Sequence, residues 1–140
     1  MGKLYEKLNF MDKKLLITGT IFGIIAIILG AFAAHGLKPL LSETALQSFE
    51  TGVRYQMYHA ILLLILGSMQ RVSIKYIKPI YTLIVVGVLF FSGSIYGLST
   101  NVLTSVNFTK IALITPLGGL LLIAAWLLLL VSFFKIKDDN

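Results

Sequence analysis

Four long apolar segments divide this chain, and they limit what it can fold into more than any other feature. A bilayer-spanning helix needs about 20 mostly apolar residues. Three segments meet this length alone. The fourth meets it once its first turn is included, because Arg54 and Tyr55 there have side chains long enough to reach the interface. The segments are residues 15–34, 53–69, 80–98 and 111–134. Short loops join them, so the sequence predicts an all-α, polytopic membrane four-helix bundle.

The composition supports a membrane rather than a soluble protein. The 140 residues are 57% hydrophobic and 13% charged, whereas soluble domains are about 45–50% apolar and about 25% charged. The net charge of +6 could suggest nucleic acid, but the basic residues flank the apolar segments and form no dense stripe. We therefore expect membrane lipids, and no nucleic acid, as partners. The chain has no cysteine, which excludes disulfides and thiolate chemistry.

The basic residues also predict the orientation of the bundle. With four spans, both termini and the central loop lie on one side, which holds nine of the twelve lysines and arginines: Lys3, Lys7, Lys13, Lys14, Arg71, Lys75, Lys78, Lys135 and Lys137. The other side holds Lys38, Arg54 and Lys110. Positive residues concentrate in cytoplasmic loops, so we expect a multi-pass protein of a bacterial cytoplasmic (inner) membrane with both termini cytoplasmic. Its parts are then a cytoplasmic N-terminal extension (1–14), a four-helix transmembrane domain (15–134) and a cytoplasmic tail (135–140).

The longest loop on the outer side, residues 36–52, has a helical pattern of its own. Pro39 ends the first helix, and Ser42 is a suitable N-cap for a new one. Apolar residues then recur at helical spacing, at Ala45, Leu46, Phe49 and Val53. This pattern predicts a short interfacial helix between the first and second spans, joined to the second near Gly52.

Small residues mark where helices can approach closely. In the first span they follow one helix face, and Gly19-x-x-x-Gly23 is typical of close helix packing. The predicted helix-packing positions are Gly19, Gly23, Ala26, Gly30, Gly93, Gly97, Gly118 and Gly119. Near the last two, Pro116 either occupies the first turn of the fourth helix or belongs to a broken helix that lines a cavity.

Polar residues gather toward the outer half of all four spans. The candidate ligand-binding set is His35, Arg54, Tyr55, Tyr58, His59, Ser92, Tyr96 and Thr115. Ionisable groups are costly inside hydrocarbon, so the two histidines need partners or a function. They could tie helix ends together by hydrogen bonds, form a binding or proton-relay site, or ligate haem or a metal. Zinc needs three or four protein ligands, so we predict no metal and no cofactor.

Three other polar or aromatic features each allow two interpretations. Arg54 either anchors the interface beside Glu50 or binds a phosphate group. The tyrosines at positions 55, 58 and 96 form either an interfacial aromatic belt or a cage that faces a ligand. Trp126 lies in the middle of its span, where core packing is the expected role.

No catalytic signature is present, and we therefore predict no enzyme. The chain has no nucleophile triad pattern and no glycine-rich phosphate loop. All six acidic residues lie outside the predicted spans. Proton-coupled carriers commonly need a carboxylate within the membrane, so an ordinary secondary transporter is also disfavoured.

Four motifs in order give the chain a family resemblance. They are GAFAAHGL at residues 30–37, TGVRYQMYHA at 51–60, FFSGSIY at 90–96 and ITPLGG at 114–119. Together they resemble the small DUF423 (UPF0382) membrane proteins over residues 15–134. The resemblance implies a four-helix inner-membrane protein, and it implies no activity because the family is largely uncharacterised.

Two functional hypotheses follow. The first is a non-enzymatic structural or accessory subunit that packs against other membrane proteins or against itself, since close-packing motifs are abundant and buried ionisable groups are scarce. The second is a small-molecule or lipid-binding or transport protein, with an outer-leaflet pocket around the two histidines.

Overall fold

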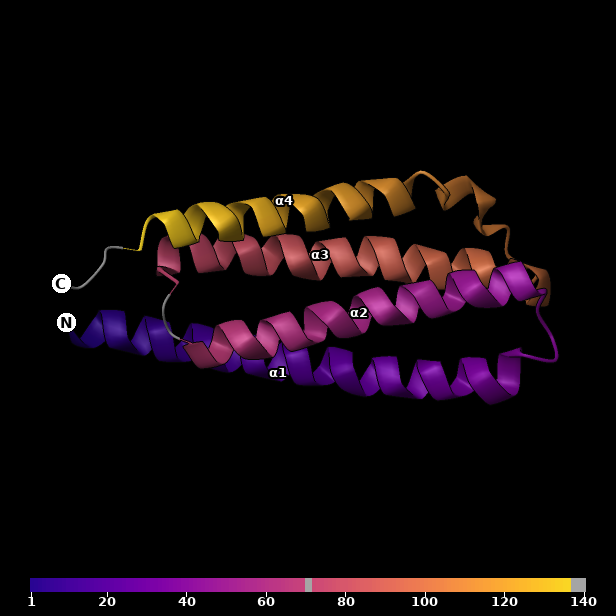
Figure 1. Ribbon diagram of the computed structural model, residues 1–140, viewed down its shortest axis with the longest axis horizontal. Coiled ribbons are helices and arrows are strands. Elements are labelled where there is room, and N and C mark those ends of the chain that lie inside the picture. The colour runs from indigo at the N-terminus through magenta and orange to yellow at the C-terminus, as the bar shows by residue number, and fades with distance from the viewer. Residues whose placement is uncertain (70–71, 137–140) are drawn as a thin grey trace.

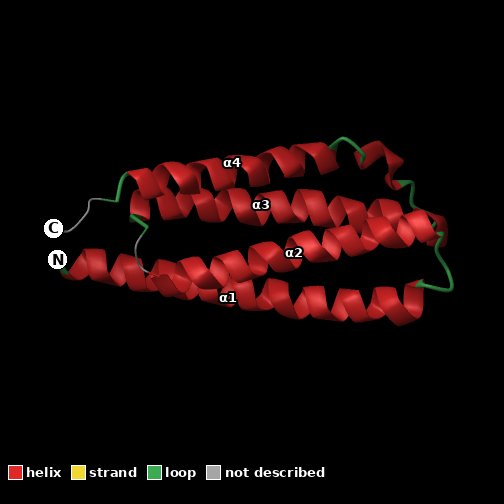
Figure 2. Ribbon diagram, viewed as in Figure 1, coloured by secondary structure: helices red, strands yellow, loops and turns green. Residues whose placement is uncertain are grey.

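The computed structural model is a bundle of four long α-helices, which confirms the predicted fold class (Figures 1 and 2). It describes residues 1–69 and 72–136, and no strand occurs among them. The helices are α1 (Gly2–Phe32), α2 (Glu43–Met69), α3 (Ile74–Ser99) and α4 (Ile114–Phe134). The start of α1 and the end of α4 lie at the same end of the bundle, here called the terminal end. The opposite end is called the loop end.

In the part of the chain that the structure describes, three helical stretches are long and apolar enough to cross a membrane. They are Asn9–Leu37, Ile74–Ser99 and Phe108–Phe134. With 27 residues α2 has sufficient length, but its middle turns carry Arg54, Gln56 and His59 and are therefore less apolar. Many isoleucines, leucines and phenylalanines stay exposed on the outer surface of the bundle. A lipid environment accounts for this exposure.

The helices pack mainly on their neighbours in the sequence. The contacts of α1 are mostly with α2, and those of α4 are mostly with α3, while α2 and α3 join the two pairs. As a result α1 and α4 form opposite flanks of the bundle (Figure 1). Hydrogen bonds also join helices that are not consecutive in the sequence, on two different faces of the bundle. Thr18 of α1 bonds to Tyr81 of α3, and Trp126 of α4 bonds to His59 of α2.

The core has two parts. The larger runs through the terminal half and centres on fully buried residues such as Leu15, Leu63 and Ile84. The smaller lies at the loop end, where Ala33 and Leu37 pack against Phe49. Lipid is as apolar as these side chains, so close packing rather than exclusion of water is what stabilises such contacts in a membrane.

Close approach depends on glycine at several crossings. A Cβ atom at Gly19 would lie 2.8 Å from the carbonyl oxygen of Ala60, so α1 and α2 are in backbone contact there. A Cβ atom at Gly118 would overlap the backbone nitrogen of Phe91, so α3 and α4 are closer still. Of the other predicted packing positions, Ala26 is buried, Gly23, Gly30, Gly97 and Gly119 have neighbours at ordinary or tight contact distance, and Gly93 has open space.

The segment predicted as a separate interfacial helix forms the beginning of α2. The Ser42 hydroxyl accepts a hydrogen bond from the Ala45 backbone nitrogen at 3.2 Å, as expected of an N-cap. The helix then continues through Gly52 without a break. A mid-helix glycine costs only about 1 kcal/mol, and at Gly52 the missing side chain leaves room for the Tyr96 ring. The apolar face around Phe49 packs on the end of α1 rather than on lipid.

The first fourteen residues are continuous with the first span, because α1 begins at Gly2. Met11 and Leu15 are both buried in the larger core cluster beside Leu66 of α2. Gly67 makes this possible, since a Cβ atom there would lie 3.1 Å from the backbone oxygen of Asp12. Of the predicted tail, the structure describes Lys135 and Ile136; Arg71 and residues 137–140 lie outside the described residues.

Candidate functional site

His59 is buried near the middle of α2 and has a hydrogen bond at each ring nitrogen. Its side chain is 4% exposed. The Trp126 indole Nε1 donates to His59 Nε2 at 3.1 Å, and His59 Nδ1 lies 2.7 Å from the Tyr55 carbonyl oxygen. Because Nε2 accepts, the neutral ring carries its proton on Nδ1 and donates it to that carbonyl. The ring therefore joins α2 to α4 without an unpaired polar atom.

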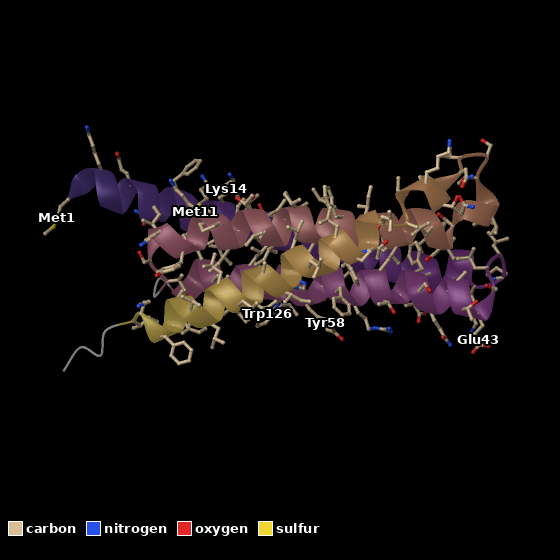
Figure 3. The ribbon with its side chains drawn as sticks, turned by 90° about the horizontal axis from the view of Figure 1, so that it is seen from above. Met1, Met11, Lys14, Glu43, Tyr58 and Trp126 are labelled. Atoms are coloured by element: carbon tan, nitrogen blue, oxygen red, sulfur yellow. The ribbon has the colours of Figure 1, made fainter. Side chains whose placement is uncertain are left out.

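A lateral cleft opens beside this pair. It has a volume of about 290 Å³ and is lined by Tyr55 and His59 of α2, Phe91 of α3, and Gly119, Leu122, Ile123 and Trp126 of α4. We call it the His59 cleft. Trp126 is 50% exposed, although it makes the hydrogen bond at the floor. In Figure 3, Trp126 and Tyr58 lie along the same edge of the bundle, on the side of α2 and α4.

A second polar cluster lies inside the bundle and joins three helices. Gln56 Nε2 of α2 donates to the Phe22 carbonyl of α1 at 2.9 Å, and the Tyr96 hydroxyl of α3 donates to Gln56 Oε1 at 2.8 Å. The Ser92 hydroxyl of α3 donates to the Gly52 carbonyl of α2 at 2.7 Å. We call these contacts the Gln56 network. Gln56 is 5% exposed and Ser92 is 1% exposed, so their polar atoms depend on protein partners.

One further hydrogen bond joins α3 to α4. The Ser94 and Thr115 hydroxyls are 2.6 Å apart. Together with the Gln56 network and the Thr18–Tyr81 and His59–Trp126 bonds, every pair of packed helices is linked by a side-chain hydrogen bond. Hydrocarbon offers polar groups no water to pair with, so these bonds satisfy the polar residues and fix how the helices are positioned.

The structure does not bring the eight residues predicted as one site together: five belong to three separate clusters, and three are exposed. Tyr55 and His59 line the cleft, Ser92 and Tyr96 belong to the Gln56 network, and Thr115 pairs with Ser94. The remaining three, His35, Arg54 and Tyr58, have exposed side chains. The Arg54 guanidinium donates a hydrogen bond to the Thr51 hydroxyl at 2.9 Å, whereas one of its two interpretations from the sequence was a pair with Glu50.

The two histidines are not together. His35 is exposed in a turn of π-helix, Ala33–Leu37, at the loop end. His59 lies about 24 Å along α2 from Glu43, deeper than the sequence predicted. The reason is that α2 begins at Glu43 rather than at residue 53, so its first turns extend the helix toward the loop end.

Sequence analysis did not assign Gln56 to a site, and it expected Trp126 to pack in the core. Trp126 is instead 50% exposed and bonds to His59. A signal for Gln56 was present, because a glutamine within an apolar span needs a partner. Trp126 could have been matched to His59 by depth: measured from the helix ends at the terminal end, they lie about 12 Å and about 15 Å along α4 and α2. That match also requires α2 and α4 to face each other, which the sequence does not specify.

Comparison with known proteins shows to which family this chain is similar. A family model described as "Protein of unknown function (DUF423)" matches residues 29–119. A UPF0382 membrane protein of Staphylococcus haemolyticus is 40% identical over 123 residues, which is 88% of this chain and 97% of that protein. The chain belongs to the DUF423 family. The resemblance inferred from the four motifs is thus confirmed.

Further relatives of this DUF423 protein come from two other bacteria. A UPF0382 membrane protein of Haemophilus influenzae is 36% identical over 131 residues, covering 91% of this chain and 99% of the relative. One from Bacillus subtilis is 35% identical over 125 residues, covering 88% and 98%. Their names describe membrane proteins and no enzyme. No solved structure matches the chain. The DUF423 match includes the whole Gln56 network apart from Phe22 and ends before Trp126.

Proposed function

We propose that this DUF423 protein binds a neutral, largely apolar molecule of the bilayer in the His59 cleft, without catalysing a reaction on it. One observation carries the proposal: a half-exposed tryptophan at mid-span is held by a buried histidine at the floor of a cleft between α2 and α4. A hydrogen bond that only joined two helices would not require the indole to border an open space.

The cleft lining indicates the class of ligand. Among the described residues, the lining is apolar apart from the Tyr55 hydroxyl and the His59–Trp126 pair, and it includes no charged side chain. Aromatic rings of Tyr55 and Phe91, with centroids 4.9 Å apart, form one wall and offer faces for packing. Pockets of this kind hold apolar ligands with a few polar contacts that set orientation. A molecule with a carbonyl or hydroxyl group next to an apolar ring or chain fits this lining.

Binding can be tested with the only tryptophan of the chain as reporter. We expect a brominated diacylglycerol in phosphatidylcholine nanodiscs to quench Trp126 fluorescence in a saturable way. A leucine at position 119 would fill the cleft, because a Cβ atom there lies 3.7 Å from the Phe91 ring and is tolerated. Gly119→Leu should weaken binding at least about tenfold, which corresponds to about 1.4 kcal/mol.

The matched control is Tyr58→Phe, which changes an exposed side chain outside the cleft lining. It should leave the saturation curve unchanged. Quenching that rises linearly with brominated lipid in the unaltered protein, or that saturates equally in Gly119→Leu, would contradict the proposal.

The accessory-subunit role stays a prediction from the sequence. Part of its support was the small-residue face of the first span, and in the bundle Gly19, Gly23 and Gly30 have α2 residues as their neighbours. These glycines thus pack α1 against α2 of the same chain rather than against a partner protein. The binding role therefore has the more specific support.

We infer that the protein lies in a cytoplasmic membrane with both termini cytoplasmic. Among residues with described side chains, the lysines and arginines toward the terminal end are Lys3, Lys13, Lys14, Lys75, Lys78 and Lys135, and those toward the loop end are Lys38, Arg54 and Lys110. This excess favours a cytoplasmic terminal end.

The cysteine-free chain allows a direct test of this orientation. We expect Lys38→Cys to react with a membrane-impermeant maleimide in intact cells, and Lys135→Cys to react only after the cells are opened. Both positions are exposed, so each serves as the control for the other. The reverse pattern of labelling would show the opposite orientation.

A further inference from the structure

A second pocket lies on the other face of the bundle, between α1 and α3 toward the terminal end. Its volume is about 350 Å³, and it is lined by Phe10, Met11, Lys14, Lys78, Tyr81 and Thr82. We call it the lysine pocket. In Figure 3, Met11 and Lys14 lie along one edge of the bundle, and Trp126 of the His59 cleft lies along the opposite edge. The two pockets are therefore separate sites.

The lysine pocket brings two positive charges together from two helices. Lys14 of α1 places its Nζ 4.9 Å from the centre of the Tyr81 ring of α3. That ring is held in turn by the hydrogen bond of 2.9 Å between the Tyr81 and Thr18 hydroxyls. Lys78 lies one helical turn before Thr82, whose hydroxyl donates to the Lys78 carbonyl. Both lysines line the pocket, and among the residues whose side chains are described no carboxylate lines it with them.

The rest of the lining favours an anion that is attached to a lipid. Phe10 is 70% exposed, and it continues the pocket as an apolar surface beside the buried Met11. A phosphodiester bound in the pocket would be attracted by both positive charges and would offer oxygens to the two ammonium groups. Its glycerol and acyl chains would then lie against Phe10. Basic pockets between transmembrane helices are known to suit anionic headgroups, whereas a free phosphate ion would gain nothing from the apolar wall.

We propose that the lysine pocket binds the phosphate of an anionic phospholipid in the leaflet at the terminal end. This proposal does not depend on the His59 cleft. It assigns Lys14 and Lys78 the role of phosphate ligands, and it assigns Phe10 and Met11 the role of the wall for the lipid chains.

The test compares two double variants that remove the same charge. Lys14→Gln/Lys78→Gln empties the pocket of its cations. Lys13→Gln/Lys75→Gln removes two exposed lysines from the same two helices, neither of which lines the pocket. Binding of phosphatidylglycerol to the purified full chain in neutral detergent would be measured by native mass spectrometry. We expect the pocket variant to bind about twentyfold more weakly and the control within about threefold of the unaltered protein.

Three results would overturn the proposal. Equal losses in both double variants would indicate diffuse attraction by net charge. Equal retention of phosphatidylcholine and phosphatidylglycerol by the unaltered protein would exclude an anionic ligand. Inorganic phosphate that displaced phosphatidylglycerol at similar concentration would assign the pocket to a free ion. Thermal unfolding of each variant, followed by circular dichroism, shows whether weaker binding results from loss of the fold instead.

Discussion

Replacement of Gly118 by alanine is expected to destabilise the bundle by on the order of 3 kcal/mol, the upper range for overpacking. The new Cβ atom would overlap the Phe91 backbone nitrogen and lie 2.8 Å from the carbonyl carbon of Phe90. Backbone atoms cannot rotate away as a side chain can, so α3 and α4 would have to separate. That separation would also move Trp126 relative to His59. Thermal unfolding in mild detergent, followed by circular dichroism, measures the loss.

Two other glycines, one on α4 and one on α3, provide matched controls for Gly118. A Cβ atom at Gly119 has its nearest neighbour at 3.7 Å, and one at Gly93 has none within 4 Å. Gly119→Ala and Gly93→Ala should leave the stability unchanged or raise it slightly, since alanine favours helix. A Gly118→Ala protein as stable as these controls would show that α3 and α4 do not cross at backbone contact.

Replacement of Gln56 by leucine should cost roughly 2 to 3 kcal/mol of stability. Leucine is similar in size, so the main loss is of hydrogen bonds rather than volume. The substitution removes the bonds to the Phe22 carbonyl and to the Tyr96 hydroxyl, and it leaves that hydroxyl half-buried without its acceptor. Unfolding in mixed micelles of increasing denaturing-detergent content would measure the change in free energy.

A double-mutant cycle identifies the source of this loss. In a Tyr96→Phe background the orphaned hydroxyl is absent, so Gln56→Leu should cost about 1 kcal/mol less than in the unaltered protein. Gln47→Leu is the control, because Gln47 lies on the same helix but is exposed, and its side chain bonds only to Glu43 among the described residues. Its effect should stay within about 0.5 kcal/mol. If Gln56→Leu were equally mild, the network would contribute nothing to helix association.

Apolar length was sufficient to predict the helices but not all of their ends. The first, third and fourth segments form helices as predicted, because a soluble fold of this length could not bury such long apolar segments. The start of α2 was placed late because Gly52 and the polar residues around Arg54 resemble a break when they are seen in sequence alone. In the bundle Gly52 is instead a contact for Tyr96, and a tertiary contact of this kind has no local signature.

The sequence predicted that polar residues of different helices would cluster, but not which residues belong to the same cluster. The sequence placed Tyr55, His59, Ser92 and Tyr96 in one group because residues on different spans were aligned by depth only. The structure separates them by direction: Ser92 and Tyr96 point toward α2 within the core, whereas Tyr55 lines the cleft. Rotation of each helix about its axis depends on crossings such as that at Gly118, and these become visible only when the helices are packed.

Packing between neighbours in the sequence has a consequence for biosynthesis. Each helix finds its main contact in the segment made just before or just after it, so the main helix pairs form between neighbours in the sequence, and topologies rich in such contacts assemble quickly. The chain can form a first hairpin from α1 and α2 while α3 is still being synthesised, and a second from α3 and α4. We therefore expect the chain to insert into the membrane as two helical hairpins, which the Gln56 network then joins.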